Sequence, residues 1–272
     1  MSVDLDVLIS TNDGLLDMKS GLETMRGVSN AVTTIVESVL TKKIPERKTA
    51  KDPVRTRLKR SFKGSYGQIF SVDVFDDKFR DDFNSISGIL WGEVISYILN
   101  DALYLIPNQV STGANDLIDS LGDKYDGVID KIRLSCLKDI HQASLRFNEN
   151  IVLRVHEGNQ QIPIANFDRE TAKVLNPIRS KQTSKYSVII TRLNIHTGNG
   201  RLQIFGEHET VAFGFDVKYK EMRFSAKKVF SENLDKNNGI PEDEWTYIQV
   251  VVEEIKLKSG YVIKYIIKSY EV

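Results

Sequence analysis

The hydrophobic pattern of the first forty residues predicts a strand followed by a helix. Residues 3 to 9 alternate between apolar and polar side chains, which is the period of a half-buried strand. Asn12 and Asp13 are typical caps for the helix that we expect next. Its apolar positions recur every three or four residues and predict a stripe that packs against a sheet. The stripe consists of Leu15, Met18, Leu22, Met25, Val28, Val32, Ile35 and Val39.

The following segments extend this pattern into a mixed unit. Two alternating runs, at 54–62 and 66–75, flank a Gly-containing turn and predict a hairpin. A helical pattern with apolar residues on one side and aspartates on the other covers 115–140. The order strand, helix, hairpin and long helices is typical of an α+β fold.

The segment 86–106 is the one stretch that resembles a membrane span. Glu93, Asn100 and Asp101 interrupt it. Because a carboxylate near the centre of a bilayer costs about 3 kcal/mol, we expect a buried core helix here and no contact with a membrane.

After about residue 148 the pattern changes to short alternating runs separated by tight turns, with one helical pattern near 225–234. Short strands at close intervals favour a small closed or half-closed barrel. We therefore expect an α+β chain of two domains. Residues 1–148 form a domain for assembly or docking, and residues 149–272 form a small, mostly β, barrel-like domain.

Composition narrows the class of protein. Hydrophobic residues make up 41% of the 272 positions and charged residues 27%, which excludes a globally disordered chain. Lysine plus arginine balance aspartate plus glutamate at 37 each, so any attraction to nucleic acid must come from a local patch. The single cysteine, Cys136, fits a reducing compartment. Because the first residues do not resemble a signal peptide, we expect a cytoplasmic protein.

Basic side chains are concentrated between residues 42 and 63, where ten lysines and arginines face only Glu46 and Asp52. Arg55, Arg57 and Lys59 occupy every second position of the expected β-strand. They would therefore project from one face at about 7 Å intervals, close to the spacing of successive phosphates in single-stranded nucleic acid. A solvated face, or an edge strand charged against aggregation, is the alternative interpretation. The candidate polyanion contacts are Arg55, Arg57, Lys59, Arg60 and Lys63.

A second basic group precedes the long barrel strand. It comprises Arg179, Lys181 and Lys185, and small barrels often use such loops to bind ligands. Tyrosines are frequent in this half, where they could act as stacking platforms. Tyr261 and Tyr265 alternate with isoleucines, however, so we expect them in a core or an interface.

Evidence for enzymatic chemistry is thin. Asp73, Asp76 and Asp77 resemble the carboxylates of metal-dependent nucleases, but no lysine follows in the usual acid-x-lysine form, and helix capping explains two of them. Phosphate-loop and nucleophile-elbow motifs do not occur, so we expect no cofactor. The histidines show no metal-binding spacing, and we expect no metal site. They are His141, His156, His196 and His208.

Several runs resemble a family of uncharacterised bacterial proteins associated with mobile elements and antiviral defence loci. The runs are the opening strand, DGLLDMKSGLETMRGVSNAVTTIV, FKGSYGQIFSVDV, the long apolar helices and SVIITRLNIHTGNGRLQIFG. The resemblance spans most of the chain. It implies a cytoplasmic bacterial protein that acts as a sensor, scaffold or adaptor with partner proteins of the same system, and it brings no catalytic residues.

These observations lead to a non-enzymatic interaction protein that forms a homo-oligomer and contacts partner proteins, and nucleic acid through its basic strand. The near-zero net charge and the apolar last strand favour association. A metal-dependent nuclease and a phage or plasmid structural protein are the alternatives. Fold alone does not choose among the three.

Overall fold

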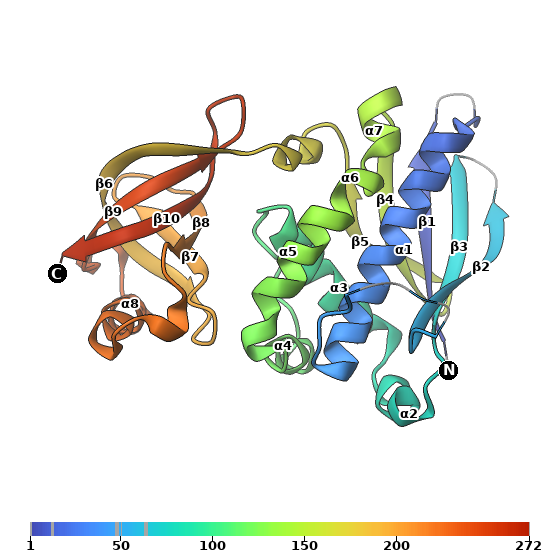
Figure 1. The fold of residues 1–272 in the computed structure, drawn as a ribbon, viewed down its shortest axis with the longest axis horizontal. Coiled ribbons are helices and arrows are strands. Elements are labelled where there is room, and N and C mark those ends of the chain that lie inside the picture. The colour runs from blue at the N-terminus through green and yellow to red at the C-terminus, as the bar shows by residue number, and fades with distance from the viewer. Residues whose placement is uncertain (1, 12–13, 47–48, 50, 63–64, 272) are drawn as a thin grey trace. The chain divides into compact units, whose positions relative to one another are not determined.

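The chain folds into two units, Met1–Leu175 and Asn176–Val272, each with its own sheet (Figure 1). The computed structural model describes residues 2–11, 14–46, 49, 51–62 and 65–271. Helices and strands are mixed, as the α+β interpretation predicts. The division lies after residue 175 and not after residue 148, because the strands at 150–157 and 160–167 belong to the first sheet.

The first unit contains five strands and most of the described helices. Its elements are β1 (Val3–Ser10), α1 (Met18–Thr41), β2 (Val54–Phe62), β3 (Tyr66–Val74), α2 (Asp77–Ser85), α3 (Gly88–Ala102), α4 (Thr112–Asp119), η1 (Gly122–Lys124), α5 (Tyr125–Ser135), α6 (Leu137–Ile140), α7 (Gln142–Phe147), β4 (Asn150–Glu157), β5 (Gln160–Phe167) and η2 (Thr171–Leu175).

The strands form an antiparallel sheet in the order β2-β3-β1-β4-β5. Central β1 places Leu5 opposite Phe70 of β3 and opposite Val155 of β4. The apolar side chains of β1 are buried in one continuous core with α1 and α3. Asp4 and Asp6 point to the opposite face, as alternation requires. This second face carries the polar residues discussed below.

The first helix starts later than its sequence pattern predicts. Asp17 caps α1 by accepting a hydrogen bond from the backbone N–H of Ser20 at 2.8 Å, while the expected caps at positions 12 and 13 lie outside the described residues. Leu15, Met18 and Leu22 are 75%, 78% and 58% exposed, so the apolar stripe is buried only in its later turns. The prediction that the whole stripe packs inward is therefore wrong for its first three positions.

The helical pattern over 115–140 is divided into α4, η1, α5 and α6. Gly122 adopts φ 51°, a left-handed conformation that an α-helix cannot continue through and that glycine tolerates best. Cys136 forms a second break, at φ −118°, between α5 and α6. The apolar face still packs into the core, with Tyr125, Val128 and Ile132 buried.

The apolar segment that follows α2 forms α3, and its central side chains are fully buried. Trp91, Ile95, Ile98 and Leu99 are each 0% exposed. Within the described part of the chain, no helix is both long enough and apolar enough to cross a bilayer.

The second unit is a closed five-stranded barrel with the strand order β10-β8-β7-β6-β9. Strands β8 and β10 run parallel, and the other described pairs are antiparallel. Phe230 of α8 packs into the barrel core against Phe213. The elements of the second unit are β6 (Ile178–Leu193), β7 (Gly200–Ile204), β8 (Thr210–Phe215), η3 (Tyr219–Glu221), α8 (Phe224–Asn237), η4 (Glu242–Glu244), β9 (Ile248–Lys256) and β10 (Val262–Glu271).

Candidate functional site

The basic strand predicted from sequence is β2, an edge strand of the first sheet. Two of its cations are neutralised within the unit. Arg57 donates two hydrogen bonds to Asp73, at 2.9 and 3.1 Å, and Lys59 Nζ lies 2.6 Å from the nearer carboxylate oxygen of Asp4. Burial raises the pKa of Asp73, but hydrogen bonds from Arg57 and Ser71 outweigh it and hold that pKa below its ordinary value.

The remaining cations of β2 have other surroundings. Arg55 lies over the ring of Phe75, with its guanidinium carbon 3.5 Å from the ring centroid, and its buried Nε has no hydrogen-bond partner. Arg60 is exposed, and no carboxylate forms an ion pair with it among the described residues. Lys63 lies outside the described residues. Arg60 is therefore the predicted contact of β2 that remains available to an anionic ligand.

A register shift explains why the cations do not form one unpaired row. Arg55 lies opposite Asp73 and Arg57 opposite Ser71, so these two share a face. The pairing with β3 then shifts between Leu58 and Arg60, which leaves Lys59 in a bulge. The alternating row expected from sequence is interrupted at its third position.

Beside these strands, the polar face of the sheet contains a buried carboxylate that the sequence analysis did not identify. Asp6 of β1 is 0% exposed and accepts two hydrogen bonds from Arg154 of β4, at 2.8 and 3.1 Å. The Nε2 atom of His156 also contacts the Asp6 carboxylate. The sequence does contain a signal for this cluster. Acidic residues alternate along β1 and basic residues alternate along β4, and the pairing of the two strands places Asp6 opposite Arg154.

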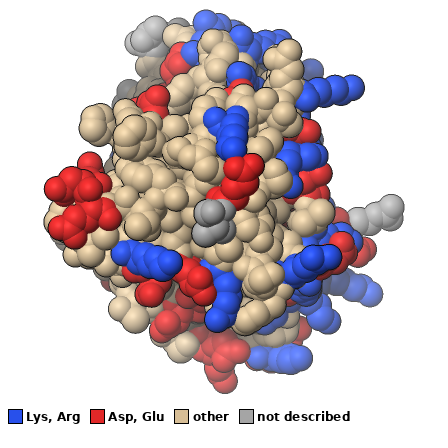
Figure 2. Space-filling view, turned by 90° about the vertical axis from the view of Figure 1, so that its left-hand side faces the viewer, with Lys and Arg blue, Asp and Glu red and all other residues tan. Residues whose placement is uncertain are grey.

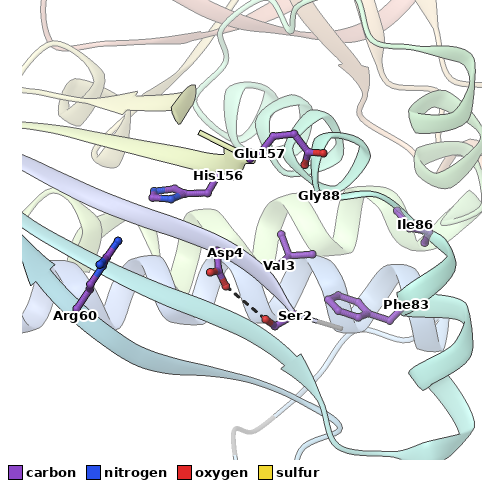
Figure 3. Close-up of a pocket in the computed structure, with 10 residues that line it drawn as sticks. Ser2, Val3, Asp4, Arg60, Phe83, Ile86, Gly88, His156 and Glu157 are labelled. Carbon is purple, nitrogen blue, oxygen red and sulfur yellow. Dashed lines mark hydrogen bonds between the residues drawn. The ribbon is translucent and has the colours of Figure 1, made fainter. Parts of the chain in front are cut away.

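A cavity of about 440 Å³ opens next to this cluster (Figure 3). Arg60 of β2 and His156 of β4 lie on one side of it, and Asp4 and Glu157 supply carboxylates. Its apolar wall consists of Val3, Phe83 and Ile86. The cavity thus combines an unpaired guanidinium, hydrogen-bond acceptors and an apolar surface.

The candidate contacts on the barrel are largely ion-paired. Arg179 lies 2.7 Å from Asp216 and 2.6 Å from Glu253, and Lys185 lies 2.6 Å from Glu271. Basic and acidic side chains are interspersed on the face of the molecule that Figure 2 shows.

Lys181 is exposed, and none of the described carboxylates forms an ion pair with it. Of the three barrel residues, it alone resembles Arg60 in this respect, but it does not line either described cavity. The structure therefore gives the second basic group less support as an anion site than the first.

The carboxylates considered for a nuclease serve other contacts. Asp73 binds Arg57, Asp76 caps α2, and Asp77 forms an ion pair with Arg80. Within the ranges that the structure describes, no group of three or more His, Cys, Asp and Glu residues is arranged to hold a metal ion.

No protein-family model, curated protein or solved structure matches this chain.

Proposed function

We propose that this protein is a non-catalytic binding protein that contacts single-stranded nucleic acid at the cavity beside β2. The observation that carries the proposal is the position of Arg60, which belongs to the basic edge strand and also lines the cavity. A phosphate could bind its guanidinium while the adjoining base enters the cavity. Arginine donors match phosphate oxygens in geometry as well as in charge.

The other walls of the cavity suit a nucleobase. Glu157 is exposed and offers carboxylate oxygens, which accept hydrogen bonds from the exocyclic amino groups of bases, whereas Asp4 is already paired with Lys59. Ile86 provides apolar surface for an unstacked base, while Phe83 is 1% exposed and packs on Trp91. The Glu157 carboxylate would repel a ligand made only of phosphates, and it therefore favours a nucleotide over a simple polyanion.

Charge pairing on β2 predicts a modest electrostatic contribution. Arg57 and Lys59 already have carboxylate partners and Arg55 lies over the ring of Phe75, so Arg60 remains to neutralise a phosphate. One neutralised phosphate on a single strand corresponds to a slope of about −0.7 in log K against log salt. This slope is smaller than the unpaired row expected from sequence would produce.

The barrel of the second unit is compatible with a binding role. Five-stranded barrels of the OB type bind oligonucleotides or oligosaccharides, although fold alone does not determine function. The resemblance to proteins of defence loci adds the proposal that this chain works in the bacterial cytoplasm with partner proteins and as a homo-oligomer.

Fluorescence anisotropy with a labelled single-stranded oligonucleotide of mixed sequence tests the nucleic-acid proposal. We expect Arg60→Ala to weaken binding about tenfold to a hundredfold, because a hydrogen bond to a charged group contributes about 1.5–3 kcal/mol. The salt slope should also fall by about 0.7. Lys138→Ala removes an exposed cation from α6 and serves as the matched control.

A second variant tests the base contact. Glu157→Gln keeps the size of the side chain but changes its hydrogen-bonding pattern, so it should alter the preference among homopolymers more than the mean affinity. The proposal fails if the parent protein does not bind single strands, or if Arg60→Ala and Lys138→Ala give the same curve.

A further inference from the structure

The barrel contains a second cavity, of about 240 Å³, whose chemistry is opposite to that of the first. It lies where β6, β7, β8 and β10 meet the loops that follow β7 and β9. Three tyrosines and two glutamates supply its polar groups, and aliphatic side chains of Ile204, Val211 and Val262 complete its wall. The polar members are Tyr186, Tyr261, Tyr265, Glu207 and Glu209.

Within the described part of the chain, the two carboxylates at this cavity lack a cationic partner. Glu207 and Glu209 are both exposed, and none of the described lysines or arginines forms an ion pair with either of them. The glutamates that lie on the barrel strands are paired instead, as Glu253 is with Arg179, Glu254 with Lys256 and Glu271 with Lys185. An anionic ligand would therefore be repelled here, whereas a cation would gain two counter-charges.

Two of the three tyrosine hydroxyls donate hydrogen bonds to glutamates. Tyr186 donates to Glu254 at 2.6 Å, and Tyr261 donates to Glu209 at 3.1 Å. A phenol that donates its one proton presents only oxygen lone pairs to a further partner. Apart from Tyr265, the polar side chains of the cavity therefore offer acceptors.

Tyr265 is the buried polar residue of this cavity. It is only 5% exposed and lines the cavity, yet its hydroxyl makes no hydrogen bond to any described residue. Its ring meets that of Tyr186 edge to face, with centroids 5.6 Å apart. Burial raises the pKa of Tyr265, so the phenol is neutral and its oxygen can accept a hydrogen bond.

We propose that this cavity binds the cationic side chain of a lysine or arginine from a basic segment of a partner protein. Ammonium and guanidinium groups carry only hydrogen-bond donors, which match a set of acceptors, and aromatic rings attract cations through their faces. A sugar hydroxyl must donate and accept, so it fits this set less well. The volume suits one side chain and not a folded surface.

Capped amino acids in NMR titrations of the full chain test the proposal, with tyrosine ring signals as the readout. The probes are N-acetyl-arginine amide and N-acetyl-lysine amide, compared with the neutral norleucine and the anionic glutamate derivatives. We expect the two cationic probes to shift the signals of Tyr261 and Tyr265 saturably. The norleucine and glutamate derivatives should bind at least tenfold more weakly.

Variants separate charge from packing. Glu207→Gln combined with Glu209→Gln should weaken the cationic probes at least tenfold and leave norleucine binding unchanged. Tyr265→Phe keeps the packed ring and tests the hydroxyl. We expect it to weaken the affinity for the cationic probes about threefold to tenfold, because one hydrogen bond is removed. Glu244→Gln, an exposed carboxylate of η4 in the same unit, is the control.

Three results would overturn the proposal. The first is equal binding of norleucine and arginine derivatives, which would make the cavity a merely apolar one. The second is tighter binding of the glutamate derivative. The third is the absence of any saturable shift in a protein whose spectrum shows a folded barrel. None of these outcomes depends on Arg60, so this proposal and the nucleic-acid proposal fail independently.

Discussion

The buried carboxylate Asp6 allows a sharp test of how the first sheet is stabilised. Its side chain is 0% exposed, while the side chains of its partners Arg154 and His156 are 16% and 19% exposed. Removing one member of a buried ion pair costs about 3–5 kcal/mol, because the other charge stays buried without compensation. We expect Arg154→Met, which keeps the aliphatic stem, to cost about 3 kcal/mol. This is the lower end of the range, since His156 remains in contact with Asp6.

Substitution of the acidic partner should reduce the free energy of unfolding by less. Asp6→Asn keeps the shape of the side chain, and the guanidinium that it leaves behind is partly in water, so we expect a loss of about 1–2 kcal/mol. The double variant should cost less than the sum of the two single variants, because it leaves no unpaired charge buried.

Urea denaturation can report this difference for the first unit alone. The chain has two tryptophans, and Trp245→Phe leaves the fully buried Trp91 of α3 as the only fluorophore of its kind. All variants are therefore made in that background, and their midpoints are compared at a common slope. If Arg154→Met costs no more than Asp6→Asn, or if the two losses simply add, the argument from a buried charge is wrong.

Two further predictions concern stability. Burial lowers the pKa of His141, so the unfolded chain binds a proton more readily than the folded one, and the free energy of unfolding should decrease as pH falls below about 6.5, by up to about 1.4 kcal/mol per pH unit. Urea denaturation between pH 7 and pH 5 measures this loss, which His141→Gln should flatten; an unchanged profile would contradict it. Gly27→Ala should destabilise by about 1–2 kcal/mol despite the higher helix propensity of alanine, because the added Cβ would lie 2.4 Å from the backbone nitrogen of Ile140. Gly21→Ala in the same helix is the control, since its added Cβ would meet only a movable methyl of Leu16, and equal thermal midpoints for the two variants would refute the steric reasoning.

Local periodicity was sufficient to predict elements but not the sheet to which each belongs. The runs at 54–62 and 66–75 contain the expected hairpin β2–β3, and the apolar segment after α2 forms the buried helix α3. The sequence pattern assigns the residues of β4 and β5 to the barrel domain, because they follow the change of pattern near residue 148. Its pairing with β1 joins residues about 150 positions apart, such as Asp6 and Arg154, and no local pattern encodes such a contact.

At the candidate site, too, the sequence predicts contacts within one strand but not contacts between strands that are far apart in the chain. Alternation correctly places Arg55 and Arg57 on one face of β2, since both contact the ring of Phe75. It could not predict that Asp4, two strands away, would bind Lys59, because that contact requires the order of the sheet. A positive segment in the sequence therefore overestimates the charge that remains available to a ligand.

The same accounting of partners explains why the two proposed cavities differ in charge although the chain is neutral. Many charged side chains of each unit form ion pairs within that unit, so the net charge of zero says little about any one surface. The charged groups at the two cavities that lack an ion-pair partner among the described residues are Arg60 and Glu157 in the first unit, and Glu207 and Glu209 in the second. Selectivity for a ligand follows from these residual groups. The first cavity should therefore favour a ligand that carries both an anionic group and hydrogen-bond donors, and the second should discriminate against anions, even though both have aromatic and aliphatic walls.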